Sequence, residues 1–396
     1  MLHRFDDFPL HQSGRPLLHP VHTGPDLFDR YSFTGYADDG SLVFGFSLGL
    51  YPARGIIDAA FSALIDGEQV SVLASGRAPA DRTRTRIGPL ELEVVEPMRV
   101  LRIACRAGTP LDAELTFTAR TAAVEEPPLR QEVDGVTVAD LTRVTQWGAW
   151  SGTLTIDGHR FTIEPAVRGS RERSWGVRPL DGPAAGPVVS GASRAPSRTA
   201  PQRFWLAAPL NFEDCAVHLA VEELTDGRRR HAFGAIVPAL LDGFETGEPA
   251  DPAAARAAAE AAEDALLAPP IVMRAAEYVL DWEPGTRRSA MASIILEPYG
   301  SADTHIIRLE PLATFHLAGL GFGHPTWGHG SWHGEEDATV LRWRPDELDP
   351  ADPAFLHVLQ VVAARWGSRS GTGVLEQLAI GNHDPTGLSG LFDPAG

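Results

Sequence analysis

Two short segments of the sequence concentrate the side chains that could carry out acid–base chemistry. The first is Gly169–Arg178, with the sequence GSRERSWGVR, in which four charged residues flank a tryptophan. As an extended segment it has two faces, one with Arg171, Arg173 and Trp175, and the other with Glu172, Ser174 and Arg178. Either face could be the inner one. The alternative is an arginine–glutamate network that ties a strand across a barrel end, and such networks are more often structural than catalytic.

The second segment is Gly321–Glu336, with the sequence GFGHPTWGHGSWHGEE. Its glycines disfavour a helix. Read as a strand, it would present one face of polar and aromatic side chains, namely Trp327, His329, Ser331, His333 and Glu335. The opposite face is nearly all glycine, broken by Trp332, and a glycine face lets another layer approach closely. We therefore expect the polar face to line a cavity shared with Arg173 and Trp175.

The histidines of this second segment raise the question of a metal. His324, His329, His333 and Glu335 are ligand types that zinc accepts. The helical i, i+4 spacing of metalloprotease pairs is missing, however, and no second histidine cluster is present. We expect no metal and no organic cofactor, and hydrogen-bonded packing at a barrel mouth is the alternative for these histidines. The sequence contains no nucleophile elbow, P-loop or dinucleotide fingerprint.

The elements that must position these segments are mostly strands. Asp-Gly, which suits tight hairpins, occurs seven times. Leu42–Leu50, Ala113–Phe117 and the pair around Asp157-Gly158 alternate with the period of two that is typical of strands. After residue 270 the predicted strands are Ile271–Asp281, Arg288–Leu296 and Thr304–Leu309. Asp251-Pro252, an alanine-rich stretch and Pro269-Pro270 together predict one helix over about residues 252–267.

Length and composition indicate two packed domains. The chain has 396 residues, of which 43% are hydrophobic and 22% charged, so it suits two hydrophobic cores. We expect an N-terminal β domain over residues 1–245, a helical connector over 246–270 and a C-terminal β domain over 271–396. A non-periodic stretch over 181–202 is either a flap at a pocket mouth or a plain surface loop.

Charge and cysteine content narrow the partners and the compartment. The formal net charge is −18, so a nucleic acid is not expected as a partner. Cys105 and Cys215 are the two cysteines, which favours a reducing cytoplasm. The sequence predicts neither a signal peptide nor an integral membrane segment. The expected partner is a small hydrophobic molecule, and a homodimer is left open.

The two segments, together with weaker patterns, resemble a known group of proteins. The patterns are Tyr31–Phe33 with Asp38–Gly40, Leu48–Pro52 (LGLYP), Arg171–Gly176 (RERSWG), Phe204-Trp205 and Gly321–Glu336. In order and spacing they cover most of the chain. They resemble the lipocalin-like superfamily of carotenoid 1,2-hydratase (hydroxyneurosporene synthase) and AttH-type proteins. Tocopherol cyclase and lipocalin-like Diels–Alderases are more distant relatives.

This resemblance implies two consecutive lipocalin-like antiparallel β-barrel or sandwich domains, with the ligand pocket in or between them. It also implies hydrophobic ligands, often isoprenoid or polyketide, and no organic cofactor. Family members commonly have Asp where this chain has Glu172, and the histidines at 324 to 333 look like a subgroup feature. The pocket type is therefore carried over, and the activity is not.

The predicted function is that of a cofactor-independent hydratase, dehydratase or cyclase, a lyase or isomerase that acts on a terpenoid, steroid-like or polyketide-like molecule. A carboxylic acid in an apolar cavity can stay protonated and donate a proton, and aromatic faces can stabilise a carbocation. The candidate catalytic residues are Glu172, Arg173, His329, His333 and Glu335. The candidate substrate-binding residues are Tyr31, Phe33, Tyr51, Trp175, Trp205, His324, Trp327 and Trp332. The alternative is a carrier that binds such molecules without turnover.

Overall fold

The chain folds almost entirely into antiparallel strands, as the sequence predicts. The computed structural model describes residues 14, 17, 24–133, 136–178, 202–240 and 269–396. Within these ranges the elements other than strands are short 3-10 turns: η2 (Leu317–Leu320), η3 (Pro345–Glu347), η4 (Pro353–Phe355) and η5 (Asp384–Thr386). The predicted helix over 252–267 and nearly all of the stretch over 181–202 lie outside the described residues.

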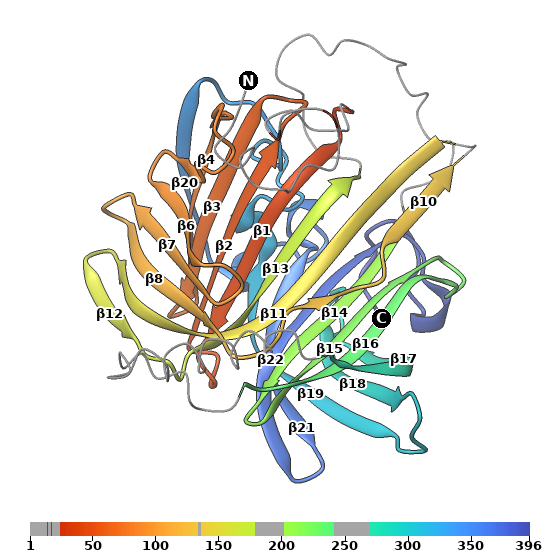
Figure 1. Cartoon of the computed structure of the whole chain (residues 1–396). Helices are drawn as coiled ribbons and strands as arrows, with labels where there is room; N and C mark the ends of the chain where they lie inside the picture. The colour runs from red at the N-terminus through yellow and green to blue at the C-terminus, as the bar shows by residue number, and fades with distance from the viewer. Residues whose placement is uncertain (1–13, 15–16, 18–23, 134–135, 179–201, 241–268) are drawn as a thin grey trace.

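The first β unit is one large antiparallel sheet (Figure 1). Its strands are β1 (Leu27–Tyr36), β2 (Leu42–Tyr51), β3 (Ile56–Ile65), β4 (Glu68–Arg77), β5 (Arg86–Ile87), β6 (Leu90–Glu96), β7 (Val100–Arg106), β8 (Leu111–Ala119), β9 (Val124–Glu125), β10 (Leu129–Val133), β11 (Val136–Ile156), β12 (His159–Ile163), β13 (Arg168–Val177) and β20 (Glu336–Trp343). In space they follow the order β20-β4-β3-β2-β1-β13-β11-β8-β7-β6-β5, and β9, β10 and β12 also pair with β11.

The second β unit is a closed barrel. Its strands, in hydrogen-bonded order, are β14 (Arg203–Phe212), β15 (Cys215–Glu223), β16 (Arg229–Pro238), β17 (Ile271–Trp282), β18 (Ser289–Pro298), β19 (His305–His316), β21 (Val358–Trp366) and β22 (Arg369–Ile380). The strands predicted at 271–281, 288–296 and 304–309 correspond to β17, β18 and β19. Two consecutive β units of the barrel or sandwich type are thus confirmed.

The second half of the sequence contributes one strand to the first sheet. The first sheet is complete up to β13, except that β20, which comes from the second half of the sequence, pairs with β4 along its edge (Figure 1). Along the chain, β13 is the last strand of the first sheet before the barrel begins with β14. The predicted domain division at 246–270 falls mostly outside the described residues and stays a prediction.

Alternation along the strands separates three apolar layers. On β2, Phe44, Phe46 and Leu48 pack into the core of the first sheet, whereas Val43 faces the other way, into a cluster with Phe315 of β19. All ten residues of β2 are buried, because the barrel and its loops cover the face of the strand that would otherwise meet solvent. The barrel has its own interior, which contains Leu206, Leu210 and Leu219 of β14 and β15.

The predicted hairpin turns are present. Asp66 and Asp157 have φ values of 50° and 49°, and the glycines that follow them have 73° and 82°. These positive values are those that an Asp-Gly turn between two strands requires. These two turns join β3 to β4 and β11 to β12. At these two places the Asp-Gly dipeptide therefore forms the hairpin that the sequence predicts.

A row of glycines crosses the middle of the first sheet. Gly169 of β13 lies opposite Gly35 of β1 and Gly148 of β11. A methyl group on Gly169 would come 2.0 Å from the carbonyl oxygen of Thr34 and 2.5 Å from the indole nitrogen of Trp150. The Trp150 Nε1–H donates a hydrogen bond to that same oxygen at 2.9 Å. The glycine row therefore makes room for buried aromatic side chains.

Gly169→Ala should consequently lower the free energy of unfolding by about 1–3 kcal/mol, because the extra methyl group overpacks this contact. Chemical denaturation followed by tryptophan fluorescence would measure the loss. Thr118→Ala is the matched control: it adds no atom, and its side chain is exposed on neighbouring β8, so it should change the free energy by less than about 0.5 kcal/mol. Equal stability of the wild type and Gly169→Ala would contradict this packing.

Candidate functional site

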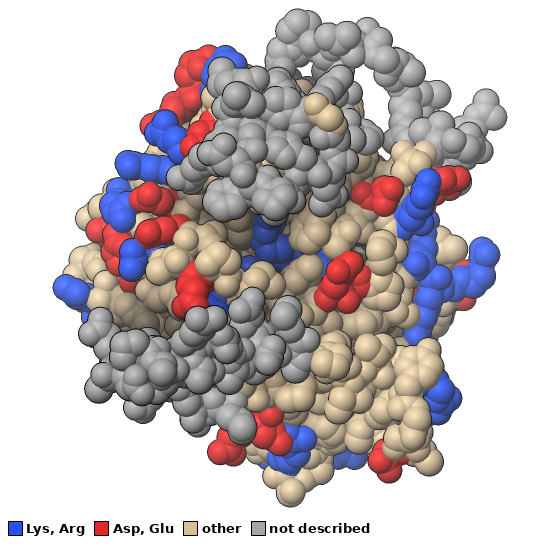
Figure 2. Space-filling view, in the orientation of Figure 1, with Lys and Arg blue, Asp and Glu red and all other residues tan. Residues whose placement is uncertain are grey.

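The main cavity lies between the two β units and not in the interior of either. Its volume is about 530 Å³. One wall is the face of β1, β13 and β11 that carries Arg30, Ser32, Glu172 and Arg143, opposite to the face whose Phe33 packs into the sheet core. Figure 2 shows a hollow in the middle of this side of the molecule, with basic and acidic side chains around it.

The opposite wall comes from the outside of the barrel. Along β14 the cavity is lined by Arg203, Trp205, Ala207 and Pro209, whereas the residues between them point into the barrel core. His218 and Glu222 of β15 and Glu376 of β22 complete this wall, and the segment around η2 closes one end. The resemblance placed the pocket in or between the barrels, and the structure places it between them.

A buried arginine and glutamate join the two walls. Arg143 Nη1 lies 3.2 Å from an oxygen of Glu126, and Arg143 sits over the ring of Trp205 of the barrel at 4.3 Å. The two oxygens of Glu126 accept hydrogen bonds from the Nε2–H groups of His218, at 2.9 Å, and His231, at 2.7 Å. Burial alone would raise the pKa of Glu126, but Arg143 and the two histidines hold it well below its usual value.

Glu172 faces the same arginine from β13 but has a different protonation behaviour. Its carboxylate lies 3.1 Å from Arg143 Nε, and 32% of its side chain is exposed. Burial raises the pKa of Glu172 above its usual value, and the negative charges of Glu376 and Glu126 raise it further, against the opposing effect of Arg143. Glu172 is therefore the carboxyl group of this wall that keeps its proton to higher pH.

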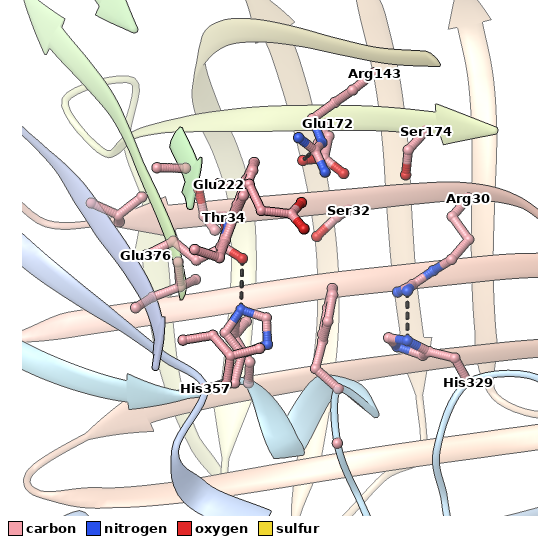
Figure 3. A pocket seen from close by; sticks show the side chains of 18 of the residues that line it. Arg30, Ser32, Thr34, Arg143, Glu172, Ser174, Glu222, His329, His357 and Glu376 are labelled. Atoms are coloured by element: carbon pink, nitrogen blue, oxygen red, sulfur yellow. Dashed lines mark hydrogen bonds and ion pairs between the residues drawn. The ribbon is translucent and has the colours of Figure 1, made fainter. Parts of the chain in front are cut away.

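Glu376 of β22 is the opposite case. His357 Nε2–H donates a hydrogen bond of 2.7 Å to Glu376 (Figure 3). Burial would raise the pKa of Glu376, but this hydrogen bond and the charges of His357 and Arg143 outweigh it and lower the pKa. Two carboxyl groups with pKa values shifted in opposite directions thus line one cavity, an arrangement that suits an acid and a base.

Arg30 and His329 form a second buried pair in the cavity (Figure 3). Arg30 Nη1–H donates to His329 Nδ1 at 2.6 Å, so the proton of the imidazole is on Nε2, which donates to the Leu320 carbonyl at 2.9 Å. Burial and the charges of Arg30 and Arg178 hold the pKa of His329 well below its usual value. His329 is therefore a neutral acceptor that positions Arg30, and its predicted catalytic role stays a prediction.

The structure divides the predicted site residues into two groups. Those that line the cavity are Glu172, Trp205, His324 and His329. Phe33 also borders the cavity, although its side chain packs into the core of the first sheet. Those that do not line it are Tyr31, Tyr51, Arg173, Trp175, Trp327, Trp332, His333 and Glu335. The prediction of one cavity lined by Arg173, Trp175, Trp327, His333 and Glu335 is therefore wrong.

The residues outside the cavity have other partners. Arg173 pairs with Asp29 at 2.6 Å and lies over the ring of Tyr31. Trp175 is 40% exposed. The exposed Glu335 accepts hydrogen bonds from Arg77, which also lies over Trp332. Tyr51 is buried against Asp58.

The strand interpretation of 321–335 fails for a backbone reason. Gly321, Gly323, Gly330 and Gly334 have φ values of 85°, 65°, 71° and 112°, which fold the segment back on itself before β20 begins at Glu336. The ring of His333 stacks on Trp327 at 3.8 Å. The side chains therefore do not alternate, and His329 alone of the predicted polar face reaches the main cavity.

Several residues of the site were missed. They are Arg30, Glu126, Arg143, His218, His357 and Glu376. One signal could have found Arg30, Arg143 and Glu376. Each is a charged residue inside a strand (β1, β11 and β22) in which apolar and polar residues otherwise alternate. Their proximity depends on the packing of the barrel against the sheet, which no local pattern predicts.

The described residues contain neither a candidate metal site nor a candidate membrane-spanning helix. Among these residues, no group of three or more His, Cys, Asp or Glu side chains has an arrangement that could hold a metal ion. Within the same part of the chain, no helix has both the length and the apolar character needed to cross a bilayer.

Residues 2–389 match the model of one protein family, described as a family of unknown function, DUF8625. The chain belongs to this family. No curated protein sequence matches it. Among solved structures, a protein of Nitrosomonas europaea provisionally described as AttH is similar, with 11% identity, a TM-score of 0.52, and coverage of 91% of this chain and 98% of that one. This similarity shows a shared fold.

Two further solved structures are similar at lower scores. Kievitone hydratase from Nectria haematococca has a TM-score of 0.46 and 11% identity, over 88% of each chain. CghA in complex with Sch210972 has a TM-score of 0.44 and 13% identity, over 90% of this chain and 89% of that one. At these scores the similarity carries no argument about activity, so the function must be argued from the cavity.

The opposite pKa shifts of Glu172 and Glu376 predict opposite effects on stability. A raised pKa means that the folded state loses stability as pH rises from the unfolded value, about 4.3, through the folded value. A lowered pKa contributes stability above the unfolded value, which is lost as pH falls through the folded one. Relative to wild type, Glu172→Gln should therefore gain stability as pH rises above about 4, whereas Glu376→Gln should lose stability as pH rises toward about 4 from more acidic values.

Chemical denaturation of the wild type and both variants at pH values below and above about 4 would measure the two slopes. Each variant serves as the control for the other, because both remove one carboxylate from the same cavity. Slopes of the same sign would contradict the assignment of acid and base.

Proposed function

We propose that the protein is a cofactor-independent lyase or isomerase that acts by acid–base catalysis on a small hydrophobic molecule of the terpenoid, steroid-like or polyketide-like classes. The observation that carries the proposal is the pair formed by Glu172 and Glu376, whose pKa values are shifted in opposite directions in one cavity. The two free cysteines support a cytoplasmic location.

In a dehydration, the two carboxyl groups would act together. Neutral Glu172 donates its proton to the oxygen of the leaving hydroxyl group, the carbon–oxygen bond breaks, and water departs. The carboxylate of Glu376 takes the proton from the adjacent carbon, whose electron pair forms the new double bond. Arg143 stabilises the charge that appears on Glu172, because the two groups are 3.1 Å apart. Hydration is the same sequence in reverse.

The aromatic rings of the cavity favour this chemistry over a carbocation cyclisation. Cation–π stabilisation needs an open ring face. Trp205 already has Arg143 over its ring at 4.3 Å, Phe322 has Arg30 at 4.6 Å, and Phe28 has Arg178 at 5.1 Å. A carbocation beside these rings would meet a positive charge on the other side. Addition or removal of water is therefore the reaction that the cavity supports best.

A carrier role is the alternative, and the apolar part of the cavity supports it. Leu129, Leu141, Leu359, Leu378 and Ile380 line the space beside the polar groups, as expected of a site for an apolar ligand. A carrier does not need an acid and a base with opposite pKa shifts. The two roles differ in one outcome, which is whether a bound ligand leaves the protein chemically changed.

Native mass spectrometry of the purified protein should first identify a co-purified ligand, which is then offered as the substrate. We expect a product that differs by one water. In heavy water, hydration should place one carbon-bound deuterium in the product, whereas dehydration should place none. Glu172→Gln should lower kcat by about a hundredfold or more, because a general acid contributes about that much, and it should leave the ligand dissociation constant nearly unchanged.

Glu335→Gln is the matched control, since this glutamate is exposed and lies outside the cavity; it should leave kcat unchanged. Recovery of the ligand unaltered from the wild-type protein would favour the carrier. Turnover by Glu172→Gln at the wild-type rate would contradict the role of Glu172.

A further inference from the structure

Arg30 is a buried cation with unused hydrogen-bond donors. It is 3% exposed, it extends from β1 into the cavity (Figure 3), and its Nη1 donates to His329. Its Nε and Nη2 atoms are buried and have no hydrogen-bond partner in the described part of the chain. A guanidinium cannot give up its charge, and a buried charge costs several kcal/mol unless it is paired. The site thus contains one positive charge, that of Arg30, which no carboxylate of the described residues pairs with directly.

The neighbours of Arg30 do not neutralise it. His329 is neutral, and Phe322 offers only its ring, at 4.6 Å. Asp58 is the carboxylate that senses the charge, but its two oxygens accept hydrogen bonds from Gly330 N–H, at 2.6 Å, and from the Tyr51 hydroxyl, at 3.2 Å. Burial raises the pKa of Asp58 to about 6, although Arg30 opposes the rise. No ion pair within 4 Å joins Arg30 to a carboxylate of the described residues.

We propose that Arg30 binds an anionic group of the ligand, a carboxylate or an equally acidic enol, through its free Nε–H and Nη2–H. These two donors lie on the same edge of the guanidinium and match the two oxygens of a carboxylate. His329 is the positioning residue, because its hydrogen bond to Nη1 fixes the guanidinium and leaves the Nε–Nη2 edge without a partner. This inference extends the proposed function by naming the substrate class of the same cavity.

The strand register relates this anion site to the catalytic acid. Arg30 lies opposite Ser174, and Ser32 lies opposite Glu172, so Arg30 and Glu172 are diagonal neighbours about 7–8 Å apart along the sheet. A ligand held by Arg30 would thus present to Glu172 an atom a few bonds away from its anionic group. The glutamates on the other side of the cavity repel an anion, so the ligand should bind in one orientation, with its anionic group at Arg30. The predicted substrate is therefore an apolar acid that reacts at a carbon near its head group.

The test measures binding and does not require turnover. Isothermal titration with 6-phenylhexanoate and with 6-phenylhexanamide compares an anion with a neutral molecule of the same shape. The wild type should bind the carboxylate about tenfold more tightly or better, as expected of charged hydrogen bonds. Arg30→Gln should abolish this preference and bind both compounds within about twofold of each other, while Arg30→Lys should keep part of it.

Arg287→Gln is the matched control, because Arg287 is equally buried but its donors reach backbone carbonyls of the C-terminal segment. It should lower the melting temperature and leave the preference intact, whereas Arg30→Gln should not lower the melting temperature. A wild type without preference, or a preference that persists in Arg30→Gln, would overturn the inference. Preference without turnover of any ligand would leave the anion site standing and count against the proposed catalysis alone.

Discussion

Glu126 is the group on which the cavity depends. It is 1% exposed and directly follows β9 of the first sheet, and its oxygens are bound by Arg143 from that sheet and by His218 and His231 from the barrel. A buried carboxylate with these partners fixes the distance between the two β units more firmly than apolar contacts could, because its hydrogen bonds have defined directions. The space beside it is held open as a cavity for the same reason.

The same charges separate the roles of the other carboxyl groups. At Glu172, burial and the negative charges of Glu376 and Glu126 together outweigh Arg143, so the pKa of Glu172 stays raised. Glu376 has its own donor in His357 and stays ionised to lower pH. Glu172 can therefore donate a proton while Glu376 can accept one, although both lie near Arg143 in the same cavity. Away from these glutamates, Arg30 adds a buried positive charge to the same cavity.

The sequence predicted the strands well because their alternation and Asp-Gly turns are local properties. It identified Glu172 from its charged surroundings and His329 from its segment, and both line the cavity. It could not choose between the two faces of β13, because burial on both sides removes the contrast between an inner and an outer face. It misread 321–335 because glycines permit a strand but here adopt positive φ values. The partners of Glu172, namely Arg143 and Glu376, come from β11 and β22, and only the packing of the two units reveals them.

The central claim, that Glu172 is a neutral acid in this cavity, can be tested by infrared difference spectroscopy between the wild type and Glu172→Gln. Above the pH at which exposed glutamates have ionised, the wild type should show the carbonyl stretch of a protonated carboxyl group that the variant lacks. The band of Asp58, whose pKa is about 6, should be present in both proteins and serves as an internal reference. Identical spectra would show that Glu172 is already ionised and would contradict its role as the acid.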